Sequence, residues 1–337
     1  MKILIYNRNS ESINLRRMGL LLEGDIVADL RAGYALYLTH EKGNAKGKEI
    51  AHVCMPRPIA DFLQLGPAAF DILNVTHEML NKLARSDRAA TGLDGEPLFS
   101  PFKECRLHAP LRPSKIIAVG LNYREHMKEG GFASPMKVPS AWIKANSSII
   151  GPTRDIEKPA IVHQLDYETE LAVVIGQRCK NVPEEKAYDV IAGYMVANDI
   201  SARDIIKVER QEGNQLLGKM FDTFFATGPW IVTKDEIPDP MNLAIMTRVN
   251  GETRQNSNTG DMIWSIPKLI AYLSQMTLEP GDVISTGTPE GVALGRKPAQ
   301  TPWWLREGDL LESEVEKIGV LRNKIVAEST MERSWRW

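Results

Sequence analysis

Short runs of β-branched and apolar residues, separated by turn signals, dominate the chain after Pro110. They occupy residues 116–119, 172–175, 194–197, 230–233, 244–249, 282–286 and 319–326. Asn250-Gly251 and Pro280-Gly281-Asp282 are typical turn sequences between such runs. Only two convincing helical stretches interrupt them, at 201–212 and 266–275. This spacing favours a mostly antiparallel β fold with a few helices over a repeated βαβ unit.

The residue pattern of the first part of the chain is different. We expect strands at 2–6 and within 18–30, the latter folding back through Glu23-Gly24-Asp25, and helices at 58–65 and 67–85. The polar, glycine-containing stretch 86–101 is typical of a linker. The fold class is therefore predicted as α+β and β-rich, with a small α+β N-terminal domain at 1–105 and a β-rich catalytic domain at 106–337.

Bulk properties exclude several classes of partner. A formal net charge of −2 over 337 residues gives no electrostatic reason to expect nucleic acid or an anionic membrane. No apolar run has the length of a membrane span, and the one at the start is too short for a signal peptide. The three cysteines, Cys54, Cys105 and Cys179, are scattered and lack metal-site spacing. They indicate free thiols in a reducing compartment, and we expect a cytoplasmic protein.

Two glutamates one residue apart, Glu168 and Glu170, are the most informative polar feature. They precede the apolar run 171–175, which predicts a buried strand. Alternate side chains of a strand share a face, so both carboxylates project from one side, with Cα atoms roughly 7 Å apart. Buried carboxylates need a positive partner, and Mg²⁺ or Mn²⁺, which prefer oxygen ligands, would supply it. The alternative is a strand end whose acids face water.

Other polar residues belong to the same constellation. His126 and Glu129 lie three residues apart, so one helical turn would let the glutamate orient the histidine as a general base, although surface helices also carry such pairs. Asp199, at the end of the strand 194–197 region, is either a third metal ligand or a helix cap. Arg203 and Lys219 add positive charge.

The segment Ser285-Thr-Gly-Thr-Pro-Glu-Gly-Val292 is a glycine-bearing loop after a predicted strand. It lacks the lysine of a phosphate-binding loop. Its residues Thr286, Gly287 and Thr288 offer backbone N–H groups and hydroxyls that could bind a carboxylate.

The order of these motifs resembles the fumarylacetoacetate hydrolase superfamily over roughly residues 110–326. The matching pieces are Gly120-Leu-Asn-Tyr-x-x-His, Leu165-Asp-Tyr-Glu-x-Glu-Leu, Asn198-Asp-Ile-Ser-Ala-Arg-Asp204, Gly218-Lys-x-Phe-Asp-Thr-Phe, Val249-Asn-Gly-Glu, Gly281-Asp-Val-Ile and Thr286-Gly-Thr-Pro-x-Gly-Val. The resemblance implies a rolled mixed β-sheet, a homodimer and one Mg²⁺ or Mn²⁺ ion per subunit.

The same resemblance implies roles for individual residues. Glu168, Glu170 and Asp199 match the metal ligands, His126 and Glu129 the catalytic dyad, and Lys219 the active-site lysine. We expect the substrate-binding residues to be Tyr123, Arg124, Arg203, Thr286, Gly287 and Thr288.

The expected activity is hydrolysis of a C–C bond in a β-diketo acid of the acylpyruvate type, as in the catabolism of aromatic compounds. An α-keto acid would leave as an enolate bound to the metal, while His126 activates water. Decarboxylation or keto–enol isomerisation of a 2-oxo or 2-hydroxy-enoic dicarboxylic acid from aromatic catabolism, or a hydratase or lyase reaction on a similar oxo acid, would use the same site. An inactive binding protein is a remote alternative, because every site residue is present.

One departure from the family bears on selectivity. Many members carry Gln three residues after the motif arginine, and this chain has Ile206. With Trp303-Trp304 as a possible apolar wall, Ile206 predicts a pocket that prefers an apolar acyl group. A second substrate carboxylate would need a cation, for which Arg124 is the obvious candidate in the sequence.

Overall fold

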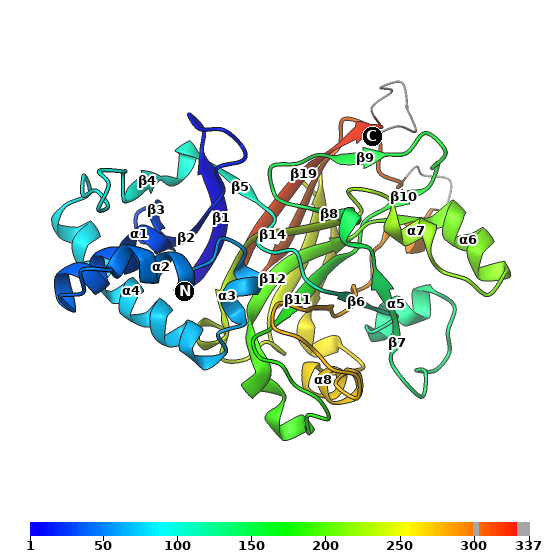
Figure 1. Ribbon diagram of the computed structural model, residues 1–337. Helices are drawn as coiled ribbons and strands as arrows, with labels where there is room; N and C mark the ends of the chain where they lie inside the picture. The colour runs from blue at the N-terminus through cyan, green and yellow to red at the C-terminus, as the bar shows by residue number, and fades with distance from the viewer. Residues whose placement is uncertain (299–302, 329–337) are drawn as a thin grey trace, which may run out of the picture.

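An open twelve-stranded sheet runs through the computed structural model, which describes residues 1–298 and 303–328 (Figure 1). Its main path is β4-β3-β2-β1-β14-β12-β11-β17-β6-β7, while β5 pairs with β1 and β8 with β14. The strands are β1 (Lys2–Arg8), β2 (Arg17–Leu22), β3 (Ile26–Asp29), β4 (Phe99–Pro101), β5 (Cys105–His108), β6 (Ile116–Gly120), β7 (Ser140–Lys144), β8 (Ile149–Ile150), β11 (Thr169–Ile175), β12 (Ile191–Asp199), β14 (Phe225–Thr233) and β17 (Val283–Ser285).

A second sheet has the order β16-β15-β18-β19-β9 and packs against the middle of the first, where β18 contacts β11 and β12. Its strands are β9 (Ile156–Lys158), β15 (Ala244–Val249), β16 (Glu252–Asn258), β18 (Leu310–Val315) and β19 (Gly319–Ala327). The short strands β10 (Leu165–Asp166) and β13 (Ser201–Ala202) pair with each other. Most pairs are antiparallel, but β17–β6, β14–β8 and β19–β9 are parallel, so the sheets are mixed.

Helices cover the ends and faces of these sheets. Helices α1, α2 and α4 lie at the opposite side of the molecule from α5, α6 and α7, and α3 lies between the two groups, near the middle of the large sheet (Figure 1). The helices are α1 (Leu30–Leu36), α2 (Gly47–Cys54), α3 (Ile59–Leu63), α4 (Pro67–Ser86), α5 (Arg124–Glu129), α6 (Arg203–Gln211), α7 (Leu217–Met220) and α8 (Ile266–Leu273). Shorter turns are the π-helix η1 (Tyr37–Glu41) and the 3₁₀ helices η2 (Phe102–Glu104), η3 (Asn146–Ser148), η4 (Glu184–Val190), η5 (Lys234–Glu236), η6 (Thr259–Asp261) and η7 (Ala293–Gly295).

The apolar run of β11 is continuous because both faces of this strand are buried. Leu171 and Val173 belong to the core shared with the second sheet. Ala172 and Val174 point the other way, into the core beneath the N-terminal helices. A strand buried on both sides has no solvent face, so its polar end at 168–170 enters the interior as well.

The predicted α+β, β-rich class is confirmed, as are the expected strands and the helices near 58–65, 67–85, 201–212 and 266–275, with small shifts of their ends. The linker predicted at 86–101 contains β4, and α1, α2 and α7 were not predicted. Within residues 1–298 and 303–328, no helix is long and apolar enough to cross a bilayer.

The N-terminal segment shares its sheet with the rest of the chain. Lys2 and Ile3 of β1 pair with Val232 and Ile231 of β14. One core cluster also joins Phe62 of the N-terminal helices to strands β11, β12 and β14. The division at residue 105 stays a prediction, and the shared core gives a way to test it.

We expect unfolding of the whole chain to be cooperative, because the two parts have one core in common. Phe62→Ala, at a fully buried position, should lower the free energy of unfolding by about 3–5 kcal/mol. Urea denaturation should show one transition by circular dichroism and by tryptophan fluorescence, shifted as a whole in the variant. Two separate transitions, with only one of them shifted, would show that residues 1–105 fold independently.

Candidate active site

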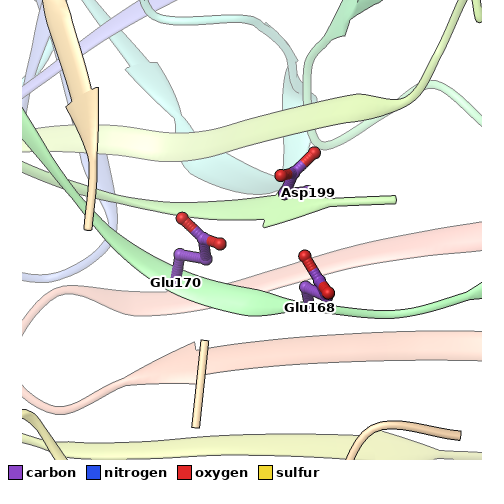
Figure 2. Close-up of side chains that lie close together, drawn as sticks. All are labelled: Glu168, Glu170 and Asp199. Carbon is purple, nitrogen blue, oxygen red and sulfur yellow. The ribbon is translucent and has the colours of Figure 1, made fainter. Parts of the chain in front are cut away.

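The ends of β11 and β12 bring three carboxylates together. The two strands are antiparallel neighbours, and the Asp199 N–H donates to the carbonyl oxygen of Glu168 at 2.9 Å. One oxygen from each of Glu168, Glu170 and Asp199 lies within 4.8 Å of the others, and all three residues are buried. Figure 2 shows the three carboxylates turned toward a common space.

Three buried cations surround this triad. Lys219 Nζ donates to Glu168 Oε2 at 2.5 Å and to Asp199 Oδ2 at 2.9 Å. Lys144 Nζ donates to Asp199 Oδ1 at 2.6 Å. Arg203 lies between Glu168 and a fourth buried acid, Asp166, with Nε 2.8 Å from Asp166 Oδ2 and Nη2 2.5 Å from Glu168 Oε1.

These contacts set opposite pKa shifts on the two glutamates. Burial alone would raise the pKa of Glu168, but the charges of Lys219 and Arg203 outweigh it and hold that pKa well below its usual value. Glu170 contacts no cation among the residues that the structure describes, and it accepts hydrogen bonds from the Ser285 hydroxyl and the Gly287 N–H. Burial, followed by repulsion from Asp199 and Glu168, raises the pKa of Glu170 to about 8.

The donor set fits a hard divalent cation. Among the described residues, four buried carboxyl groups meet three cations, so Glu170 is left without a cation, and its raised pKa means that it keeps a proton at neutral pH until a metal ion displaces it. Glu168, Glu170 and Asp199 offer oxygen atoms alone, the ligand type that Mg²⁺ and Mn²⁺ prefer. A divalent cation held by these three residues would replace the missing positive charge.

A cavity of about 260 Å³ opens onto Glu168 and Glu170. His126 and Glu129 of α5 line it, with His126 Nδ1 at 3.3 Å from Glu129 Oε2. Glu129 Oε1 also accepts the N–H of Gly291 at 2.9 Å, which ties α5 to the loop after β17. The other lining residues are Val119, Gly120, Leu121, Gly130, Phe132, Met136, Ser140, Trp142, Arg203, Arg210, Gln215, Lys219, Thr288, Val292, Leu294 and Gly295.

The structure thus brings together His126, Glu129, Lys219, Arg203 and the three carboxylates, and it places Thr288 on the cavity wall. The glycine-bearing loop does bind a carboxylate, but that carboxylate is Glu170, held by Gly287 N–H at 3.0 Å. The hydroxyls of Thr286 and Thr288 donate to backbone carbonyls of β11.

Other expected residues lie away from the cavity. Tyr123 is fully buried and does not line it, and Arg124 is exposed beside it. Ile206 packs against Gly218 in the core. Trp303 stacks beneath the guanidinium groups of Arg254 and Arg296, and neither it nor Trp304 is among the lining residues. The expectation of an apolar pocket wall built from Ile206 and the tryptophan pair therefore loses its structural basis.

Several site residues were not identified from the sequence. Asp166 stands in the same motif as Glu168 and Ser285 begins the glycine-bearing loop, so their positions were a usable signal, although the residues that they contact, Arg203 and Glu170, lie far away in sequence. Lys144 ends the strand Ser140–Lys144 and meets Asp199 only in the folded sheet. Arg210 looks like an ordinary charge on a surface helix.

Comparison with known proteins gives a consistent result. The family model described as "Fumarylacetoacetate (FAA) hydrolase C-terminal" matches residues 115–326. The human protein named "Oxaloacetate tautomerase FAHD2B, mitochondrial" is 41% identical over 275 residues, which cover 81% of each chain.

Two solved structures illustrate the likeness in fold over almost the whole chain. The 5-carboxymethyl-2-hydroxymuconate delta-isomerase of Mycobacterium smegmatis has a TM-score of 0.66 and 30% identity, with 97% of this chain and 100% of that one covered. Maleylpyruvate hydrolase from Sphingobium sp. SYK-6, solved with manganese (II) and pyruvate, has a TM-score of 0.69 and 26% identity over 98% of this chain and 100% of the other.

Glu170→Gln should weaken binding of Mn²⁺ by about tenfold or more, equivalent to at least about 1.4 kcal/mol, because it removes the ligand carboxylate that has no cation of its own among the described residues. Calorimetric titration of chelator-treated protein with Mn²⁺ measures this. Glu125→Gln, at an exposed position paired with Lys128, is the matched control and should leave affinity unchanged. Equal affinity in wild type and Glu170→Gln would contradict the assignment of Glu170 as a ligand.

The raised pKa of Glu170, about 8, predicts how metal affinity depends on pH. Below that pKa the carboxyl carries a proton that the cation must displace, so affinity should rise about tenfold per pH unit until about pH 8 and then level off. Calorimetry in two buffers of different ionisation enthalpy should detect nearly one proton released per cation at about pH 6.5 and almost none at about pH 9.5. Binding without proton release at the lower pH would contradict the assignment.

Proposed function

The chain belongs to the fumarylacetoacetate hydrolase family, and on that premise we propose that it is a divalent-metal-dependent enzyme that interconverts the keto and enol forms of a small 2-oxo acid. The convergence of Glu168, Glu170 and Asp199 beside Lys219, in a cavity that also holds His126, is the observation that carries this function. Oxaloacetate, which gives the human relative its name, is the first candidate substrate.

The charged groups around Glu168, Glu170 and Asp199 favour binding of an anionic oxo acid. A divalent cation on the three carboxylates would act as a Lewis acid and stabilise negative charge that develops on the 2-oxygen of the substrate. Lys219, buried between Glu168 and Asp199, adds a fixed positive charge at the same place. Once a divalent cation displaces the proton of Glu170, the four carboxylates, the three protein cations and the metal would together carry one excess positive charge, which matches a single substrate carboxylate.

Keto–enol interconversion requires a group that moves a proton between C3 and the 2-oxygen of the substrate. His126 can do this, since Nδ1 faces Glu129 and Nε2 has no partner among residues 1–298 and 303–328. Glu129 is itself held by the N–H of Gly291, so it can fix the orientation of the imidazole ring. We assign proton transfer to His126 and orientation of His126 to Glu129.

Hydrolysis of an acylpyruvate-type β-diketo acid is the second candidate. The His126–Glu129 pair specifically favours it, because hydrolysis needs an activated water and a histidine oriented by a carboxylate is a suitable base. The structural likeness to maleylpyruvate hydrolase supports the same reaction. Decarboxylation would use the same carboxylates and lysine.

Product analysis separates these reactions. The Mn²⁺-loaded protein is mixed with enol-oxaloacetate, with oxaloacetate and with acetylpyruvate, and enol absorbance, CO₂ and released acids are followed. Accelerated loss of enol absorbance without cleavage supports tautomerisation, and its abolition by a chelator supports metal dependence. Release of pyruvate with a second acid indicates hydrolysis instead, and CO₂ with pyruvate indicates decarboxylation.

His126→Ala should slow tautomerisation by about 10²–10⁴-fold, because it removes the group that moves the proton. Affinity for Mn²⁺, measured by calorimetry, should not change, since His126 is not a ligand of the triad. A variant that retains the wild-type rate would exclude His126 as the proton carrier. If hydrolysis of acetylpyruvate alone is lost, the pair serves the attack by water.

The partners and location expected from the sequence belong to this proposal as well. A homodimer is testable by light scattering coupled to size-exclusion chromatography. The cytoplasmic location is testable by cell fractionation, and the human relative, whose name includes "mitochondrial", supplies the competing location.

A further inference from the structure

One arginine on the cavity wall has no acidic partner in the part of the chain that the structure describes. Arg210, in the last turn of α6, lines the cavity together with Gln215. Its Nε and Nη2 both donate to Gln215 Oε1, at 3.1 and 3.0 Å. Its Nη1 makes no hydrogen bond with any residue that the structure describes. Gln215 therefore orients the guanidinium group while part of its donor set stays free.

The neighbouring acids of α6 are engaged elsewhere. The Glu209 carboxylate accepts the N–H groups of Leu216, Leu217 and Gly218 at the start of α7. Asp204 accepts the N–H of His163. No carboxylate of the described chain lies within ion-pair distance of Arg210. Arg210 remains exposed to solvent while it lines the cavity. Partial desolvation, followed by the nearby charge of Arg203, lowers the pKa of Arg210.

The other cations of the cavity are already paired. Arg203 contacts Asp166 and Glu168, and Lys219 contacts Glu168 and Asp199. With a divalent cation added, the charge of these groups matches one substrate carboxylate. A second carboxylate would need a further positive charge. Among the described lining residues, Arg210 is the cation that is not already paired with an acid.

We propose that Arg210, oriented by Gln215, binds the substrate carboxylate that lies farther from the metal ligands, and that it thereby makes the site prefer a dicarboxylic 2-oxo acid over a monocarboxylic one of the same length. This inference rests on the proposed function, because it takes the triad as the site of the first carboxylate. Arg210 replaces Arg124, which does not line the cavity, as the residue that recognises a second carboxylate.

A pair of ligands with the same carbon chain tests this. 2-Oxoglutarate and 2-oxopentanoate differ only in a terminal carboxylate against a methyl group. Binding of each to the Mn²⁺-loaded protein is measured by calorimetry, which does not depend on turnover. Wild type should bind 2-oxoglutarate about 10–100-fold more tightly, the usual strength of a charge-assisted hydrogen bond. Arg210→Gln should erase that preference and leave affinity for 2-oxopentanoate unchanged, and Arg210→Lys should restore part of it.

Lys207→Gln, which removes an exposed cation from the same helix, is the matched control and should keep the full preference. Similar urea midpoints for all variants show that they fold. Equal wild-type affinity for the two ligands would overturn the role of Arg210 and leave the proposed function standing. Loss of the preference in Arg124→Gln and not in Arg210→Gln would likewise overturn it. If neither ligand binds the Mn²⁺-loaded protein, the proposed function fails together with this inference.

Discussion

The buried, unpaired carboxylate of Glu170 is the constraint on which the rest of the site depends. A negative charge inside the protein is costly, and among the described residues Glu170 is contacted by a hydroxyl and a backbone N–H but by no cation. The cations Lys144, Lys219 and Arg203 are directed to the other acids, so Glu170 is the acid whose pKa is raised, to about 8. A buried acid without a cation gives the fold no stability in the absence of a ligand, which is why we interpret this arrangement as one built for binding a cation.

Local sequence patterns were sufficient for much of the fold. Alternation, turn dipeptides and apolar runs correctly placed most strands and the helices α3, α4, α6 and α8. The pairing of β1 with β14 could not be predicted this way, because the paired residues are more than two hundred positions apart and nothing in Lys2–Arg8 specifies a partner. Helix α7 is a single short turn held by Glu209, so it has no periodic pattern of its own.

The site residues also fall into those that the sequence identified and those that it could not identify. Glu168, Glu170 and Asp199 follow from strand geometry and from the order of the motifs, and the structure brings them together. The contributions of Lys144 and Arg210 depend on how distant segments meet, which spacing does not reveal. Arg124 and Ile206 show the converse. Their proximity in sequence to functional residues implied a place in the pocket, but one faces solvent and the other packs against Gly218.

The loop after β17 holds two parts of the site at once, since Gly287 binds Glu170 and Gly291 binds Glu129. Both glycines have positive φ, and a Cβ at Gly291 would lie 2.2 Å from the carbonyl oxygen of Arg254. The start of α6 carries the buried Arg203, but its last turn, with Arg210, is exposed and can change without disturbing the core. We therefore expect that, as such a family diverges, substrate range changes through the exposed end of α6 while the loop after β17 stays constant.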